Sequence, residues 1–364
     1  MNKHSIIQLI RDLEDYLLIK RSGLFDSNYY CRNYPDVRLA DINPLWHFIR
    51  YGWSEGRNPN VSFNCSGYLT INPSVKNSGI NPLIDFIRNN NKRQRKKNYP
   101  LVSVIVMSYN QEAYIKQCID SILKQQRNFK MEVILGDDAS TDDTRKILQE
   151  YTKNFPDLFF QLPKQENLGY TRNLKRCLSA CKGEYIAFCD GDDYWTDVNK
   201  LKKQLELLYQ HPDLSMCFSA IELLYEEDQR LILHQGQQAF KSNSLTFRDF
   251  FSDNIIATFT CCLYRADIIS CLPEKLFDVY VADWIFNFCC AHLGHIGFIK
   301  EAMSVYRIHS KGSWSGKSRL KQLEQSLLHI DDYDSLLDFV YHEEFCQIKE
   351  RIRSLLETPK DNED

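Results

Sequence analysis

From Tyr99 onwards the sequence alternates between short apolar runs and amphipathic segments, and this alternation constrains the fold more than any other feature. The first run, residues 101–107, is apolar and β-branched throughout, which is typical of a strand covered on both faces. Further strands are expected at 131–135, 158–162 and 185–189, and helices at 114–124, 143–155, 170–180 and 199–210. Strands and helices that alternate through short loops predict an α/β domain with a doubly wound, mainly parallel sheet and flanking helices.

A different pattern fills the residues before this domain. Residues 25–52 align with residues 63–90 at an offset of 38, and the alignment pairs 42–45 (Ile-Asn-Pro-Leu) with 80–83 (Ile-Asn-Pro-Leu). Self-similarity at a fixed spacing predicts two copies of one supersecondary unit. In each copy an Asn stands where a helix N-cap is expected and a Pro follows it, so the segment is predicted to be a small helical module.

The two patterns divide the chain into three parts. We expect a helical repeat module with a basic linker at residues 1–98, the α/β domain at 99–316 and a helical tail at 317–364. After Leu214 the alternation becomes less regular, which indicates mixed strands, and a helix is expected over residues 283–292.

Charge and hydropathy limit the classes of partner. The chain has 45 Lys and Arg against 48 Asp and Glu, a net charge of −3, which argues against a nucleic-acid-binding protein. Its apolar runs are too short to cross a bilayer, and its first residues carry scattered charges, so a cytoplasmic protein is expected. The basic run at residues 89–98 fits peripheral contact with an anionic membrane surface and fits a solvated linker equally well.

The thirteen cysteines favour a reducing compartment, because their number is odd and no Cys-x-x-Cys sequence occurs. One cluster, Cys289, Cys290, His292 and His295, has metal-binding residue types. A core helix is the preferred interpretation, since closed zinc sites need four converging ligands at a recognisable spacing.

Three polar clusters follow the predicted strands. Ligands of open α/β sheets bind beyond the carboxyl ends of the strands, so these clusters are the candidate site. The first cluster is Ser108, Tyr109 and Asn110, the second contains Asp137 and Asp138, and the third is Asp190-Gly191-Asp192-Asp193.

Asp190 and Asp192 are two residues apart at a strand end, where side chains i and i+2 project to the same side. Two carboxylates at such close range repel each other unless a cation lies between them. Oxygen ligands favour Mg²⁺ or Mn²⁺, which would keep coordination positions for phosphate oxygens. The alternative is a surface turn, in which Asp193 caps the residues that follow.

The second cluster is assigned to a ligand as well. Asp137 and Asp138 are able to accept hydrogen bonds from a base N–H or a ribose hydroxyl, although local helix capping is an alternative use of such residues. Tyr109 is suited to stacking on a base or to flanking the core. Arg172, near the start of a predicted helix, is suited to a phosphate, a base or a neighbouring carboxylate.

These clusters occur within VSVIVMSYNQEAYIKQCIDSILKQQ, EVILGDDASTDDT, ENLGYTRN and KGEYIAFCDGDDYW. From about Leu101 to Trp195 the sequence resembles family 2 glycosyltransferases of the GT-A fold, of the type that builds bacterial surface polysaccharides. The resemblance implies inverting sugar transfer from a nucleotide-diphosphate donor, most often UDP-linked, with Mn²⁺ or Mg²⁺. It assigns Asp138 to the uracil and Asp192 to the metal, with Asp190 nearby.

An inverting transferase needs one base that takes the proton of the acceptor hydroxyl. In the resembled family this base is often the Asp of a Glu-Asp pair at a helix start. The matching residue is Asp283, which follows Ala282 in place of the Glu. A helix N-cap is the alternative role for Asp283, and Asp278 is the second candidate for the base.

Residues 306–310 (Tyr-Arg-Ile-His-Ser) resemble the closing strand of the same family. The resemblance makes His309 a candidate metal ligand and Lys311 a candidate phosphate contact. The sequence has no Gln-x-x-Arg-Trp, which accompanies processive synthases of the family, so transfer of a single sugar is expected.

The sequence therefore predicts a glycosyltransferase that acts on a glycan or lipid-linked acceptor. A catalytically inactive nucleotide-sugar-binding subunit of an assembly complex is the alternative. A nucleotidyltransferase is disfavoured, because residues 108–114 contain neither Gly nor Lys. The oligomeric state does not follow from the sequence.

Overall fold

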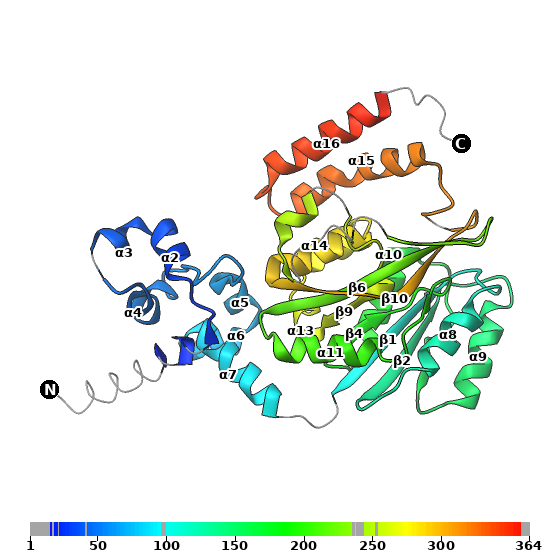
Figure 1. Ribbon diagram of the computed structural model, residues 1–364, viewed down its shortest axis with the longest axis horizontal. Coiled ribbons are helices and arrows are strands. Elements are labelled where there is room, and N and C mark those ends of the chain that lie inside the picture. The colour runs from blue at the N-terminus through cyan, green and yellow to red at the C-terminus, as the bar shows by residue number, and fades with distance from the viewer. Residues whose placement is uncertain are drawn as a thin grey trace. The chain divides into compact units, whose positions relative to one another are not determined.

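The computed structural model describes residues 15–16, 18–20, 22–40, 42–95, 100–234, 237, 244–251, 254–312 and 314–357, with the backbone alone at 89–95, 244 and 247. The chain divides into two compact units (Figure 1). One comprises Met1–Asn98 with His211–Asp213, and the other comprises Tyr99–Gln210 with Leu214–Asp364.

The first unit is helical, and its two aligned segments have the same order of elements. The helices are α2 (Ser27–Asn33), α3 (Pro35–Leu39), α4 (Pro44–His47) with a π-helical turn (Phe48–Gly52), α5 (Cys65–Ile71), α6 (Pro73–Ser78) and α7 (Pro82–Arg95). Asp26 caps α2 and Asn64 caps α5, each through a backbone N–H three residues later. The same local signals therefore produce the same helices twice.

One hydrogen bond recurs at the same repeat positions although its acceptor residue differs. Tyr30 Oη lies 3.0 Å from His47 Nδ1 in the first copy, and Tyr68 Oη donates to Asp85 Oδ2 at 2.7 Å in the second. Each bond joins the first and the last helix of its copy. The repeat therefore preserves a tertiary contact as well as the helix signals.

The second unit is an α/β domain around a ten-stranded sheet in the order β3-β2-β1-β4-β9-β6-β10-β5, with β7 on β6 and β8 on β10. The strands are β1 (Leu101–Ser108), β2 (Lys130–Asp137), β3 (Phe159–Gln161), β4 (Tyr185–Phe188), β5 (Tyr194–Trp195), β6 (Leu214–Tyr225), β7 (Arg230–Leu233), β8 (Ser244–Leu245), β9 (Cys262–Arg265) and β10 (His295–Ile308). The first four are parallel, whereas β9 is antiparallel to both neighbours. The predicted fold class, an α/β domain with a mainly parallel sheet and flanking helices, is confirmed. The strands after Leu214 pair in both directions, as expected from the less regular sequence.

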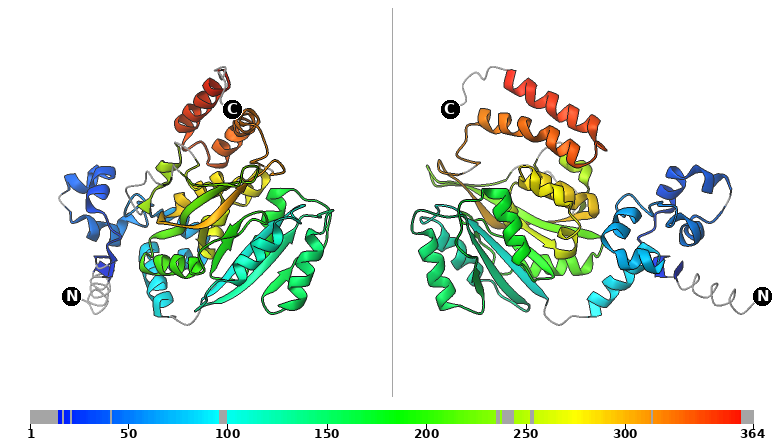
Figure 2. Two further views of the ribbon diagram at one scale, coloured as in Figure 1. Left: turned by 45° about the vertical axis from the view of Figure 1, so that its right-hand side comes forward. Right: turned by 180° about the vertical axis from the view of Figure 1, so that it is seen from behind.

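Helices cover both faces of this sheet (Figure 2). They are α8 (Ile115–Leu123), α9 (Thr144–Asn154), α10 (Tyr170–Ala180), α11 (Lys200–Gln210), α13 (Ala266–Ile269), α14 (Asp283–Leu293), α15 (Arg319–Leu336) and α16 (His342–Glu357). Short 3₁₀ helices span Phe247–Phe251, Phe259–Cys261 and Glu274–Asp278. One core packs under α8 and α11, and a second packs between the sheet, α10 and α14.

The last two helices contribute to this second core. Ile330 of α15 and Phe345 of α16 are buried in the same cluster as Phe286 and Cys290 of α14. The tail is therefore amphipathic rather than merely polar, since its apolar side chains pack against the sheet domain.

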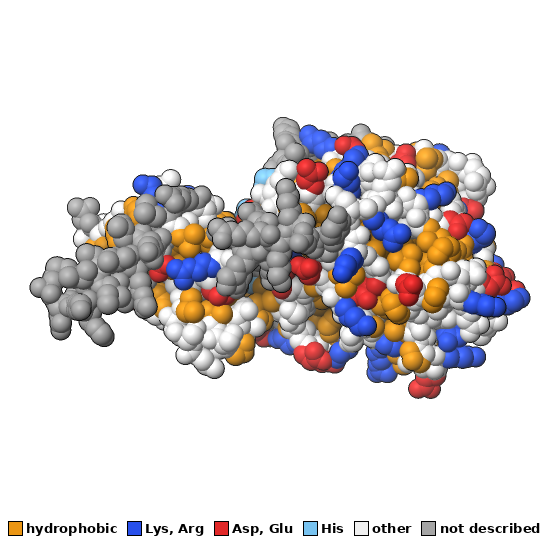
Figure 3. All heavy atoms as spheres, turned by 90° about the horizontal axis from the view of Figure 1, so that it is seen from below, with side chains coloured by type: hydrophobic (Ala, Val, Ile, Leu, Met, Phe, Trp, Pro, Cys, Tyr) orange, Lys and Arg blue, Asp and Glu red, His pale blue; other side chains and the backbone are white. Residues whose placement is uncertain are grey.

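The Cys and His residues near the end of α14 have ordinary packing roles. Cys289 and Cys290 are buried in the apolar core, and His292 Nδ1 lies 2.8 Å from Tyr341 Oη. In the described part of the chain, no helix is long and apolar enough to cross a membrane. On the face in Figure 3, basic and acidic side chains are interspersed, so no single-sign field covers it.

Candidate active site

The three polar clusters lie along one edge of the sheet. Ser108 and Asp137 pair in the parallel register of β1 and β2, and Asp190 follows β4, which pairs with β1 on its other side. Parallel strands bring their carboxyl ends together, which is why residues 108, 137 and 190 meet. This arrangement is the one expected for the candidate site.

The first cluster is tied to the second through Asn110. Its Oδ1 accepts from the backbone N–H of Thr141 at 2.8 Å, and its own N–H donates to Ser140 Oγ at 2.9 Å. Tyr109 is half exposed, and Ser108 is buried with no hydrogen-bond partner for Oγ among the described residues. Asn110 thus joins two loops, Tyr109 exposes an aromatic ring, and Ser108 has a buried hydroxyl group without a hydrogen-bond partner among the described residues.

Asp137 and Asp138 both have protein partners. Asp137 is buried, and its Oδ2 accepts from Arg145 Nη1 at 3.3 Å. The two oxygens of Asp138 accept from the N–H groups of Leu168 at 2.8 Å and Gly169 at 2.9 Å. The carboxylate of Asp138 therefore holds the turn that leads into α10, and the predicted contact with a uracil would add to this role.

Asp193, the last residue of the third cluster (190–193), anchors this acidic loop through its carboxylate. Asp193 is buried, with Oδ2 accepting from Thr260 Oγ1 at 2.6 Å and Oδ1 accepting from the backbone N–H of Arg307 at 3.0 Å. Gly191 packs closely, because a Cβ there would lie 3.1 Å from the Met107 carbonyl oxygen, whose backbone position is fixed in β1. Asp193 therefore anchors the loop to β10 and the residues before β9, beyond the local turn considered from the sequence.

Asp192 meets His309 as the sequence predicts for two ligands of one cation. His309 Nε2 lies 3.1 Å from Asp192 Oδ2, and the Tyr114 ring packs 4.8 Å from the imidazole, between ring centroids. The buried imidazole of His309, beside the carboxylate of Asp192, therefore has one nitrogen, Nδ1, without a hydrogen-bond partner among the described residues.

Negative charge is concentrated around Asp190. Burial, together with the charges of Asp192 and Asp283, raises the pKa of Asp190 to about 8. Burial also raises the pKa of Asp283 to about 7. Asp190 is thus within electrostatic reach of Asp192, two residues away in the sequence, and of Asp283, which lies more than ninety residues further along the chain.

A divalent cation suits this charge distribution. Across the described residues, no three His, Cys, Asp or Glu side chains form a complete metal-binding group. Mg²⁺ and Mn²⁺ sites in phosphate-binding enzymes, however, often take one or two carboxylates and complete their shell with phosphate oxygens and water. Asp190 and Asp192 fit such a site, because a cation would relieve the repulsion that raises the pKa of Asp190.

Asp283 is the first residue of α14, and Ala282 occupies the N-cap position. Asp283 Oδ1 accepts from Asn254 Nδ2 at 3.0 Å and from the backbone N–H of Trp284 at 2.8 Å. The raised pKa of about 7 would let this carboxyl group exchange a proton near neutral pH. Ala282, and not Asp283, is the N-cap residue, so the two roles considered for Asp283 from the sequence leave the base as the one to test.

The remaining candidates lie around this centre. Arg172, exposed in the first turn of α10, and Asp278 line one cavity of about 450 Å³ together with Thr171 and Tyr280. Lys311 is exposed in the turn after β10. The cavity begins at the turn that Asp138 holds, which places it beside the polar edge of the sheet.

Two residues at this site were not singled out from the sequence. Thr260 Oγ1 accepts from the Asp190 N–H at 3.1 Å and donates to Asp193 at 2.6 Å, so it closes the acidic loop. Arg307 donates from Nε to the Asp192 carbonyl at 2.8 Å. Arg307 lies in the quoted closing-strand motif, two residues before His309, whereas no sequence signal pointed to Thr260.

A family model described as Glycosyl transferase family 2 matches residues 103–272. The match includes the acidic clusters that contain Asp138 and Asp192, and it ends before Asp283 and His309. The match to the family model thus covers Asp138 and Asp192, which are predicted to contact the donor, and does not cover Asp283, the predicted base.

Two curated relatives illustrate the similarity. An uncharacterized protein of Mycobacterium tuberculosis is 36% identical over 216 residues, which are 58% of this chain and 60% of that protein. The putative teichuronic acid biosynthesis glycosyltransferase TuaG of Bacillus subtilis is 34% identical over 168 residues, 46% of this chain and 63% of TuaG. The chain thus spans less than two thirds of the length of these relatives.

Solved structures are similar only loosely. TarS residues 1–349 of S. aureus, in complex with UDP-GlcNAc, superposes with a TM-score of 0.48 at 22% identity, over 69% of this chain and 71% of that one. The mannosyltransferase PcManGT of Pyrobaculum calidifontis, in complex with GDP-Man and Mn²⁺, reaches 0.49 at 18% identity, over 79% and 84%. At these TM-scores the likenesses support no inference about ligands of this chain.

Proposed function

We propose that the chain, whose residues 103–272 match the model of glycosyl transferase family 2, is a family 2 glycosyltransferase of the GT-A type, an inverting enzyme of surface-polysaccharide synthesis. It moves a single sugar from a nucleotide-diphosphate donor, for which UDP is preferred, to a hydroxyl of a glycan or lipid-linked acceptor. The observation that carries this proposal is the hydrogen-bonded pair of Asp192 and His309 in the acidic loop after β4, beside the strand ends that bear Ser108 and Asp137. The name of TuaG supports the role in polysaccharide synthesis.

In the proposed mechanism Asp283 is the catalytic base. The acceptor hydroxyl loses its proton to the carboxylate of Asp283 as its oxygen attacks the anomeric carbon of the donor sugar. The bond from that carbon to the diphosphate oxygen breaks on the opposite face, so the configuration inverts. A pKa of about 7 leaves a large fraction of Asp283 deprotonated, and so able to accept the proton, at neutral pH.

Asp190 and Asp192 are the proposed holders of Mn²⁺ or Mg²⁺, with His309 as an additional ligand. The bound cation would neutralise charge on the leaving nucleotide diphosphate. The nucleotide would lie over Ser108, Tyr109 and Asn110, with Asp137 and Asp138 toward the base. Arg172 and Lys311 are the proposed contacts for its phosphates, since both side chains are cationic and exposed.

The proposed location is the cytoplasm, with contact to the inner face of the membrane if the acceptor is lipid-linked. The basic run at residues 89–98, on which the membrane hypothesis rests, has side chains that lie outside the described residues. Vesicle cosedimentation of the full chain would test that contact.

Calorimetric titration tests the donor site first. UDP is titrated into the wild-type protein and Asp192→Ala, each with Mn²⁺ and with chelator. We expect metal-dependent binding in the wild type and its loss in the variant. If GDP or dTDP binds with Mn²⁺ and UDP does not, the preferred base is wrong, and if none binds, the donor site is refuted.

A transfer assay then separates the enzyme from its alternative, a subunit that binds nucleotide sugars without turnover. Ala282, which replaces the Glu of the family pattern, is the observation that keeps this alternative open. Hydrolysis or transfer of the donor sugar that disappears in Asp283→Asn excludes the inactive subunit. Tight donor binding without any turnover would favour it.

A further inference from the structure

Arg307 makes an unusual number of polar contacts for a buried side chain. It is 5% exposed, its Nε donates to the Asp192 carbonyl at 2.8 Å, and its backbone N–H donates to Asp193 Oδ1 at 3.0 Å. Arg307 of β10 thus contacts Asp192 through its side chain and Asp193 through its backbone. Thr260 and the Met107 carbonyl hold Asp190, Gly191 and Asp193, whereas Arg307 holds the backbone of Asp192, so the position of Asp192 depends on Arg307.

The other two guanidinium nitrogens of Arg307 bind separate elements. Nη1 donates to Glu226 Oε2 at 2.5 Å, just beyond β6, and Nη2 donates to Gln117 Oε1 at 2.6 Å on α8. All three side-chain nitrogens are therefore engaged in a planar fork. Lysine, with a single ammonium group, cannot reproduce three such directions.

Aromatic rings complete the environment of this cation. The Arg307 guanidinium lies 4.6 Å from the centroid of Tyr114 and 5.5 Å from that of Tyr194. Tyr114 also packs against His309. Arg307 is thereby connected to both members of the Asp192–His309 pair. It donates a hydrogen bond to Asp192, and the ring of Tyr114 packs against both Arg307 and His309.

We propose that Arg307 is a positioning residue that holds Asp192 in the geometry in which it meets the cation of the donor. The proposal rests on the proposed function, because it assumes that Asp192 contacts such a cation. Arg307 acts through the carbonyl of Asp192 and the carboxylate of Asp193 and does not itself touch the substrate. Glu226 and Gln117 in turn orient the guanidinium.

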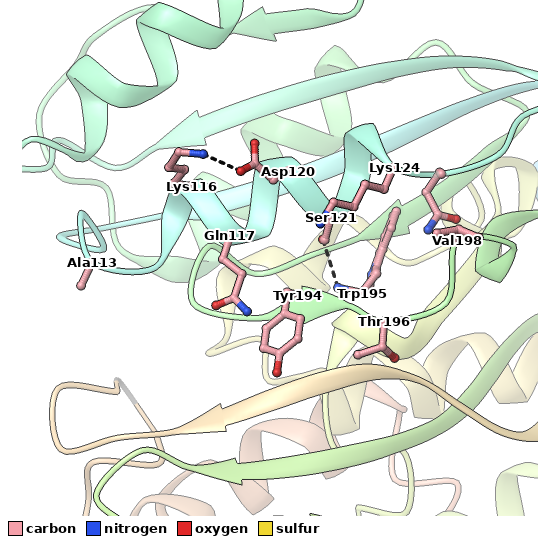
Figure 4. A pocket seen from close by; sticks show the side chains of 11 residues that line it. Ala113, Lys116, Gln117, Asp120, Ser121, Lys124, Tyr194, Trp195, Thr196 and Val198 are labelled. Atoms are coloured by element: carbon pink, nitrogen blue, oxygen red, sulfur yellow. Dashed lines mark hydrogen bonds and ion pairs between the residues drawn. The ribbon is translucent and has the colours of Figure 1, made fainter. Parts of the chain in front are cut away.

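The hydrogen bond between Gln117 and Arg307 allows the positioning role of Arg307 to be tested by substituting an exposed residue. Gln117 is exposed and lines a groove of about 510 Å³ with Tyr194, as Figure 4 shows. The preceding residue, Lys116, lines the same groove but pairs with Asp120 at 2.6 Å. Lys116→Ala is therefore a matched control, on the same helix and in the same groove, because it leaves the hydrogen bonds of Arg307 in place.

The experiment measures the affinity of the protein for Mn²⁺ at saturating UDP, and for UDP in chelator. For Arg307→Lys we expect the Kd for Mn²⁺ to rise about tenfold or more, since hydrogen bonds to a charged group are lost. Gln117→Ala and Glu226→Gln should give rises of about threefold, because the first removes one of the three contacts and the second removes the negative charge from another. UDP affinity in chelator should change in none of them, and Lys116→Ala should match the wild type.

A second measurement needs no metal. Amide hydrogen exchange of residues 192–195 in the metal-free protein should become faster in Arg307→Lys and Gln117→Ala than in Lys116→Ala. A purely structural role would lower overall stability without this selective change in exchange or in Mn²⁺ affinity. If Arg307→Lys does not fold, the two partner variants still decide the question.

The outcomes separate the two proposals. A wild-type protein that shows no metal-dependent binding of UDP, GDP or dTDP refutes the donor site itself. A wild-type protein that binds nucleotide with Mn²⁺, while Arg307→Lys, Glu226→Gln and Gln117→Ala bind equally well, refutes the positioning role of Arg307 alone. Selective loss of Mn²⁺ affinity in these variants supports it.

Discussion

Two acidic pairs stand at strand ends in this domain, and they differ in their partners. Asp137 and Asp138 after β2 are bound by Arg145 and by two backbone N–H groups. After β4, burial and the charges of Asp192 and Asp283 raise the pKa of Asp190 to about 8. Similar sequences thus produce one neutralised pair and one pair that still needs positive charge.

The difference indicates separate roles. A carboxylate that already accepts several hydrogen bonds contributes to local structure besides any ligand contact, whereas crowded carboxylates at an edge are suited to a cation and to proton transfer. The predictions below test whether Asp137 and Asp138 stabilise the fold in addition to their proposed contact with the donor base, and whether the acidic centre after β4 binds the cation and takes the proton.

The largest effect is expected from Asp283→Asn, which removes the proposed base beside the unneutralised pair. Transfer should fall by about 10²- to 10⁴-fold, the usual contribution of a general base. In the wild type, the rate should rise with pH through about 7, as Asp283 loses its proton. Asp278→Asn, in the neighbouring cavity, is the matched control, and a larger loss in that variant would transfer the role to Asp278.

A comparison of Asp192→Ala with Asp137→Asn separates function from structure directly. The first should weaken metal-dependent nucleotide binding by more than about tenfold while the protein stays folded. The second should lower the free energy of unfolding by about 2 kcal/mol, because Arg145 loses its charged partner. Urea denaturation and calorimetry measure both, and weaker nucleotide binding with unchanged stability in Asp137→Asn would contradict the distinction.

The metal-free protein should lose stability as pH rises, because the pKa of Asp190 is raised by burial and by the charges of Asp192 and Asp283. The folded-state pKa of Asp190, about 8, lies above its ordinary value of 3.8, so the folded state holds a proton that the unfolded state has released. The stabilising effect is complete below about pH 4 and is lost as pH rises through about 8.

The thermal midpoint of the metal-free wild type should therefore fall more between pH 6 and pH 8.5 than that of Asp190→Asn. Mn²⁺ should reverse most of the decline in the wild type, because it binds the folded state. Equal pH profiles for the two proteins would show that Asp190 does not titrate in this range.

The smallest effect concerns the loop after β2. Ala139 has a φ of 64°, a left-handed conformation that glycine adopts without a steric penalty. Ala139→Gly should therefore raise the free energy of unfolding by about 0.5 to 1 kcal/mol, after the greater chain entropy of glycine is included. Ala291→Gly, inside helix α14, should instead lower it, because glycine is disfavoured in a helix interior, and the reverse ranking would contradict this account.

Local patterns predicted the framework of the domain well. Helix α10 has the expected bounds of 170 and 180, and β1 extends the predicted strand by only one residue, to Ser108. In α9 the expected first residue, Asp143, occupies the N-cap position instead. Such features depend on neighbouring residues, which is why apolar periodicity and capping signals identify them.

The sequence by itself determined the order of strands and helices, the repeat, and the placement of acidic clusters at strand ends, because these follow from short-range patterns. Only the tertiary structure decided which carboxylates are neutralised. The donors to Asp138 lie about 30 residues away, and Arg307 is more than 100 residues from Asp192. Their charges act through space, and no local pattern records which distant side chain will lie beside a given carboxylate.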